Sequence, residues 1–112
     1  MAAIANLTID QGASFSSDVT VKDSNGDPFN LTGYTATAKM AKGYSSTRTR
    51  TTLTTSIGSA TTGVVTLSLT PTQTAALDAE RFVYDLEITE TASGTVTRVI
   101  EGIITVRPQV SI

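Results

Sequence analysis

Oxygen-bearing side chains at alternate positions make the stretch DSNGDPFNLTG (residues 23–33) the first candidate for chemistry. Asp23, Asn25 and Asp27 could supply oxygen ligands to a calcium ion. The EF-hand calcium loop needs glycine at its sixth position and glutamate at its twelfth. Counted from Asp23, this chain has proline and tyrosine there, which excludes that loop. A looser cation site remains an alternative, but we favour a tight turn, with positive φ in the Asn-Gly pair and aspartates that bond the backbone.

A carboxylate pair and a short basic segment are the other candidates. Asp85 and Glu87 are two residues apart, so they share one face of a strand and could in principle serve as acid and base. In a sheet, such a pair more often forms the solvated face. Arg48 and Arg50 could contact an acidic partner or a phosphate, although arginines in a polar loop are commonly only solvated. With Tyr44 as the best exposed aromatic candidate, we predict partner contacts at Tyr44, Arg48 and Arg50, and no catalytic, metal or cofactor-binding residue.

Composition restricts the chemistry further. The 112 residues include no cysteine and no histidine, so thiol nucleophiles, zinc–thiolate sites and imidazole bases are excluded. The formal charge of −2 leaves no basic field for nucleic acid and no polybasic membrane patch. The first ten residues lack the basic flank and apolar run of a signal peptide, and no 18 apolar residues run together. We therefore expect a cytoplasmically made, soluble chain with one domain over residues 1–112.

The elements that must position these candidates are predicted by alternation of apolar and polar residues. With 22 threonines and 11 serines, the composition also favours strands. Clear alternation covers residues 14–23, 33–42, 64–69, 81–89 and 95–106, and weaker alternation surrounds Leu7–Ile9 and Leu53–Ile57. The inward-facing sets are Phe15, Ser17, Val19 and Val21; Tyr34, Ala36, Ala38 and Met40; Val65, Leu67 and Leu69; and Phe82, Tyr84, Leu86 and Ile88.

Two interruptions of this pattern are informative. Thr70 is a plausible N-cap, followed by proline at the first helical position and by Gln73 to complete a capping box, so we predict one short helix near residues 71–79. The alternation changes phase near Glu101–Gly102, which predicts a bulge or bend. Together the pattern predicts an all-β chain: an antiparallel, immunoglobulin-like β-sandwich of about seven strands, without the cysteine pair and tryptophan of antibody domains.

Two segments together resemble a known family. The first is VTVKDSNGDPFNLTGYTATAKMAK, and the second runs from LSLTPTQTAALDAERFVYDLEITE to VRPQV. They are similar to the immunoglobulin-like module of tailed-phage baseplate upper proteins and to small virion structural proteins of T4-like cyanophages. Glu80 departs from the family pattern, which has glycine before the R-[FY]-x-Y-D strand. The resemblance implies a non-enzymatic component of a phage particle, held by other virion proteins.

Three functions follow as hypotheses. The first is a virion structural protein present in several copies, with the tail or baseplate favoured over the head. Capsid decoration is the alternative within the same class. A glycan-binding or host-attachment module is the alternative of another class, since sandwiches often present ligand loops. The partners expected for the first are other virion proteins, without nucleic acid, membrane or cofactor.

Overall fold

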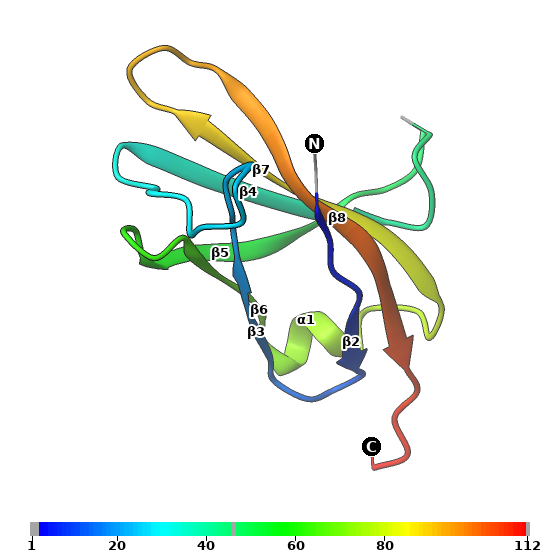
Figure 1. Cartoon of the computed structure of the whole chain (residues 1–112). Helices are drawn as coiled ribbons and strands as arrows, with labels where there is room; N and C mark the ends of the chain where they lie inside the picture. Colours follow the sequence, from blue (N-terminus) through cyan, green and yellow to red (C-terminus); the bar gives the residue numbers. More distant parts are fainter. Residues whose placement is uncertain (1–2, 46, 112) are drawn as a thin grey trace.

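A computed structural model describes residues 3–45 and 47–111 and shows a mostly β chain with one short helix (Figure 1). The prediction of an all-β chain is confirmed in this sense. Within these residues no helix has the length and apolar character needed to span a bilayer. The elements are β1 (Ala3–Ile4), β2 (Leu7–Asp10), β3 (Phe15–Thr20), β4 (Tyr34–Ala41), β5 (Thr51–Ser59), β6 (Val64–Leu69), α1 (Pro71–Ala75), β7 (Arg81–Glu90) and β8 (Val96–Arg107).

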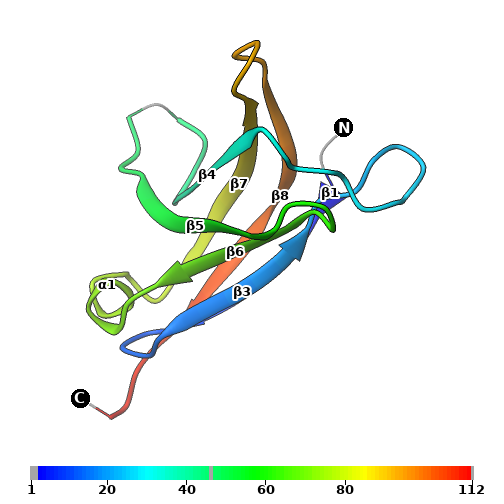
Figure 2. The same ribbon diagram turned by 90° about the vertical axis from the view of Figure 1, so that its left-hand side faces the viewer.

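The strands follow one curled path, a half-barrel, instead of forming two clearly separated sheets (Figures 1 and 2). Their order is β1-β8-β7-β4-β5-β6-β3, and β2 also pairs with β8. β5 joins the two halves. Its residues Thr51–Leu53 pair with β4, whereas Thr54 and the residues after it pair with β6. Where β4 and β5 separate, the Thr55 hydroxyl donates to the Ala36 carbonyl at 2.9 Å, so a side chain replaces the missing backbone ladder.

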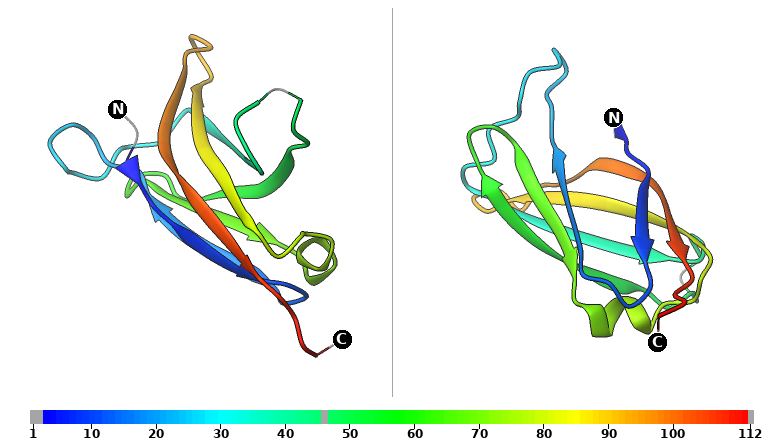
Figure 3. Two further views of the ribbon diagram at one scale, coloured as in Figure 1. Left: turned by 90° about the vertical axis from the view of Figure 1, so that its right-hand side faces the viewer. Right: turned by 90° about the horizontal axis from the view of Figure 1, so that it is seen from below.

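The sheet is antiparallel except at its N-terminal edge, which differs from the fully antiparallel prediction. β1 and β2 both run parallel to β8, with Ala3 opposite Ile100 and Leu7 opposite Ile104. They lie along the edge of β8 that β7 does not occupy (Figure 3). Alternation in a single strand predicts which residues are buried, but it carries no information on the direction of the neighbouring strand.

The core lies in the concavity of the curled sheet and is filled by the inward-facing sets that alternation predicts. Residues from both halves are almost completely buried, including Val65 and Leu67 on one side and Leu86 and Ile104 on the other. The predicted sets are buried or half-buried throughout. Burial of an aliphatic side chain contributes about 1.5–3 kcal/mol, so these stripes supply the main driving force for the fold.

The helix closes one end of the half-barrel (Figure 3). The predicted capping box is present: the Gln73 amide donates to the Thr70 hydroxyl at 3.2 Å, and the Thr70 amide donates to the Gln73 side chain at 2.8 Å. The predicted extent to residue 79 is wrong, because the helix ends at Ala75. The amide of Leu77 bonds the Thr74 carbonyl, three residues back, in a tighter turn that places the Leu77 side chain in the core.

The predicted irregularity in β8 resolves into two separate features. Leu86 pairs with Ile100 and Glu87 with Arg98, so the bulge leaves Val99 without a partner, two residues before the predicted place. Gly102 has another role. A Cβ atom there would lie 2.3 Å from the Ala5 carbonyl oxygen, so only glycine lets the link between β1 and β2 approach this closely.

The hydroxyl of Tyr84 fixes the same link from inside the sheet. It donates a hydrogen bond to the Ala5 carbonyl, although Ala5 is 79 residues away in sequence. Burial of the ring raises the pKa of Tyr84 from 10 to about 12. Tyr84 therefore packs in the core with a hydrogen-bonded hydroxyl, which confirms the interpretation of its place in the sequence.

Replacing Gly102 by alanine tests the close approach of the β1–β2 link. We expect Gly102→Ala to lower the free energy of unfolding by about 1–3 kcal/mol, because the added methyl group must displace backbone. Urea unfolding followed by circular dichroism measures this change. The matched control is Gly58→Ala in β5, where the nearest heavy atom is 3.6 Å from the added Cβ, and we expect a change within about 0.5 kcal/mol. Equal effects of the two substitutions would contradict the steric explanation.

The raised pKa of Tyr84 predicts a loss of stability at alkaline pH. The unfolded chain loses the tyrosine proton near pH 10 and the folded chain only near pH 12. The folded state therefore binds more protons between these values, so stability is fully present below pH 10 and falls as pH rises toward 12. Urea unfolding over this range should show a smaller fall in Tyr84→Phe, because all other groups titrate alike in both proteins. An identical fall in the two proteins would show that Tyr84 does not contribute.

Candidate functional site

Between β4 and β5 the structure describes residues 42–45 and 47–50, and one of the predicted contact residues holds their backbone in place. Arg50 folds back on it and donates to three carbonyl oxygens: those of Ser45 at 2.6 Å, Arg48 at 2.9 Å and Tyr44 at 3.1 Å. Hydrogen bonds from an ionised donor are among the stronger ones in proteins. The guanidinium group thus serves as an internal clamp, and it fixes the backbone at Tyr44, whose side chain remains 68% exposed.

The outer face of β4 and β7 presents a row of polar side chains to this segment. The register places Lys39 opposite Asp85 and Thr37 opposite Glu87. The Asp85 carboxylate also lies 3.4 Å from the Nε of Arg98 on β8. The two acidic residues therefore belong to the solvated face of the sheet, as their spacing predicts, and they lie side by side with cationic neighbours.

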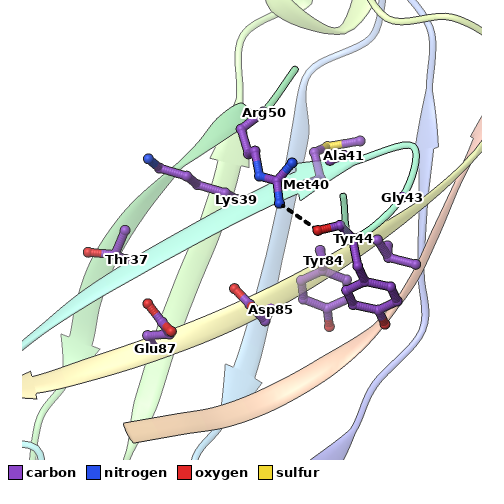
Figure 4. A pocket seen from close by; sticks show the side chains of 11 residues that line it. Thr37, Lys39, Met40, Ala41, Gly43, Tyr44, Arg50, Tyr84, Asp85 and Glu87 are labelled. Atoms are coloured by element: carbon purple, nitrogen blue, oxygen red, sulfur yellow. Dashed lines mark hydrogen bonds between the residues drawn. The ribbon is translucent and has the colours of Figure 1, made fainter. Parts of the chain in front are cut away.

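Tyr44 and Arg50 overhang these strands and form a hollow of about 220 Å³ (Figure 4). In the close view Lys39, Asp85 and Glu87 surround it from the sheet, while Arg50 and Tyr44 border it from the loop. The other lining residues are Thr37, Met40, Ala41, Gly43, Val83 and Tyr84. The structure thus places two of the predicted contact residues, Tyr44 and Arg50, beside the carboxylate pair. In the sequence these two groups were separate candidates.

Arg48, the third predicted contact residue, lines a different hollow of about 330 Å³ between the same segment and the chain that follows α1. Beside it, the Lys42 ammonium group lies 2.6 Å from Asp78 and 2.7 Å from Glu80. Hydrogen bonds to Asp78 and then Glu80 raise the pKa of Lys42. These exposed, solvent-screened ion pairs join the β4–β5 segment to the chain between α1 and β7.

The Asp23–Asp27 stretch is a turn in which the backbone uses the aspartate oxygen. Oδ1 of Asp23 accepts from the amides of Asn25 at 2.9 Å and Asp27 at 3.0 Å, and Gly26 has φ of 84°. This confirms the role predicted for Asp23. The positive φ of the Asn-Gly pair lies at Gly26 and not at Asn25, and the described hydrogen bonds include none to the Asp27 carboxylate. Across residues 3–45 and 47–111, no cluster of three or more acidic side chains could hold a metal ion.

Tyr34, the other inward tyrosine, reaches the end of the sheet. Its hydroxyl donates to the Glu90 carboxylate at 3.4 Å, and its ring meets Phe29 edge-on with centroids 5.3 Å apart. Desolvation, together with the negative charge of Glu90, raises the pKa of Tyr34. This tyrosine therefore packs and bonds as its inward position predicts.

Lys39 and Thr37 are the lining residues that sequence reasoning did not single out. Alternation in residues 33–42 does place both on the outward face. Their proximity to Glu87 and Asp85, however, follows from the β4–β7 register, which a single sequence does not specify.

Comparisons with known proteins identify a shared fold. No protein-family model and no curated protein matches the chain. Among solved structures, the N-terminal domain of phage TP901-1 ORF48 is similar with a TM-score of 0.57 and 11% identity, over 92% of this chain and 85% of that domain. The Lin-41 filamin domain (TM-score 0.45, 18% identity, 89% and 82% coverage) and a family 123 glycoside hydrolase from Clostridium perfringens (0.41, 9%, 97% and 24%) are less similar. The chain thus shares its fold with a domain of a phage protein.

Replacing Arg50 tests the clamp. In Arg50→Lys we expect faster amide hydrogen exchange at residues 47–49, because a single ammonium group lacks the planar fork that reaches the three carbonyls. Global stability should change by less than about 0.5 kcal/mol, since the segment is exposed. Arg48→Lys, two residues away, is the matched control and should leave exchange unchanged. Equal exchange in both variants would contradict the clamp.

Proposed function

We propose that the chain is a non-enzymatic structural module of a phage particle, attached through protein–protein contacts. The observation that carries this proposal is the likeness to the N-terminal domain of phage TP901-1 ORF48, which extends over 92% of the chain. The resemblance of two long segments to phage virion modules supports it independently at the sequence level. We include in the proposal that the curled sheet is a variant of the immunoglobulin-like architecture.

Open strand edges supply a physical means of attachment. β7 occupies one edge of β8, and β1 and β2 cover the other only from Ile100 onward, so the segment Val96–Val99 has a free edge in the described structure. It forms part of the β7–β8 hairpin that projects from the sheet (Figure 2), and Val96 is 56% exposed. A neighbouring virion protein could add a strand here, with main-chain hydrogen bonds for affinity and a pocket for Val96.

The side chains favour a structural role over catalysis. The chain has no histidine or cysteine, and its most buried tyrosine hydroxyl already holds the Ala5 carbonyl. Asp85 is engaged by Arg98, and Arg50 by the loop carbonyls. These polar groups therefore make intramolecular contacts that stabilise the fold, which supports a structural role.

Within the particle, we place the module in the tail or baseplate, with capsid decoration as the alternative of the same class. The preference rests on the sequence resemblance to baseplate modules. We expect several copies around a symmetry axis, because virion components generally occupy repeated positions.

Detection in purified particles tests this function. We expect mass spectrometry of density-purified virions, from the phage whose genome encodes the chain, to find the protein in a fixed ratio to the tail proteins. Immunogold labelling should mark the tail end of intact particles. Gold on the head would establish the decoration alternative, and abundance in the lysate with absence from purified virions would overturn the structural role.

A further inference from the structure

The hollow beneath Tyr44 has the parts of a small binding site. It combines an exposed aromatic ring with hydroxyl, ammonium and carboxylate groups from Thr37, Lys39, Asp85 and Glu87 (Figure 4). Ligand sites commonly pair aromatic surface with a few convergent polar groups. We propose that this hollow binds one neutral pyranose unit of a glycan.

Charge balance decides against an ionic ligand. Lys39 and Arg50 contribute two positive charges to the lining, and Asp85 and Glu87 contribute two negative ones. A cationic peptide segment would be repelled by the first pair and by Arg98, which lies 3.4 Å from Asp85. An anionic ligand would be repelled by the second pair. A neutral ligand rich in hydroxyl groups can donate hydrogen bonds to the carboxylates and accept one from the ammonium group without charge repulsion from either pair.

Size and shape favour a single ring. The volume of about 220 Å³ is below the range of about 300–1,000 Å³ that holds drug-sized ligands. One sugar ring suits such a volume, with its remaining glycan chain in solvent. The carbon–hydrogen face of a pyranose is apolar and can lie against the Tyr44 ring, while its hydroxyl groups point toward the sheet.

The Arg50 clamp prepares the site before a ligand arrives. Because the guanidinium group already bonds the Tyr44 carbonyl at 3.1 Å, the loop that carries the ring need not be ordered on binding. Preorganisation of this kind lowers the entropy cost of association. On the sheet side, Lys39, Asp85 and Glu87 stand on paired strands and are positioned by backbone hydrogen bonds. The site thus consists of a fixed loop above a rigid floor.

Titration of ¹⁵N-labelled full-length protein with glucose, galactose, mannose and N-acetylglucosamine tests the proposal. We expect at least one sugar to produce saturable amide shifts in β4 and β7 around Thr37, Lys39, Asp85 and Glu87, with a dissociation constant on the order of 1 mM. Tyr44→Ala should weaken this binding about tenfold or more, whereas Tyr44→Phe, which keeps the ring, should bind within about twofold of the original protein.

A second pair of variants tests the contribution of the polar side chains to sugar binding. Glu87→Gln should weaken binding about tenfold, because a charge-assisted hydrogen bond is lost while the side-chain shape is kept. Glu101→Gln, on the same sheet and opposite Asp85 but outside the lining, should have no effect. The absence of saturable shifts with all four sugars would overturn the proposal. So would saturable binding of a tetralysine peptide that Glu87→Gln abolishes, since the hollow would then accept a cation. Neither result depends on where the protein resides in a particle.

Discussion

The curl of the sheet depends on one strand that pairs with different neighbours along its length. β5 pairs with β4 up to Leu53 and with β6 from Thr54 onward. One continuous strand therefore joins the two halves of the sheet at the position where the sheet bends. This bend brings the apolar faces of β3 and β6 opposite those of β7 and β8. Their mutual burial, at roughly 25 cal/mol per Å² of apolar surface, stabilises the fold. The concave core, the helix that closes it and the convex polar face all follow from this geometry.

Much of the fold could be predicted from period-two alternation, because burial on one face of a strand leaves a direct record in the sequence. The side chains of Phe82, Tyr84, Leu86 and Ile88 show this most clearly, and the capping box at Thr70 is equally local. The half-barrel and the parallel placement of β1 and β2 were not predictable in this way. They depend on contacts such as Ala5 against Gly102, between residues far apart in sequence whose types do not encode their meeting.

The candidate site shows the same division. Tyr44 and Arg50 could be selected by type, as an exposed ring and a cation in a polar segment. Their relation to Asp85 and Glu87 required the β4–β7 register. Arg48 and Arg50 are equivalent candidates in the sequence. In the structure the guanidinium group of Arg50 donates hydrogen bonds to three backbone carbonyls, whereas Arg48 lines another hollow. Which of the two arginines bonds the loop carbonyls depends on where each side chain lies in the folded chain, and residue type alone does not specify this position.

The parallel pairing of β1 and β2 with β8 determines at which end of the sheet a fused tag or protein would be attached. The first described residue, Ala3, lies opposite Ile100 and next to Val96–Val99, whose outer edge is unpaired among the described residues, whereas β8 ends at Arg107, at the end of the sheet where the helix lies (Figure 1). An affinity tag or fluorescent protein fused before Ala3 would crowd that free edge. The same fusion after Ser111 would leave that edge open, so for labelling or surface immobilisation these two fusion positions are not interchangeable.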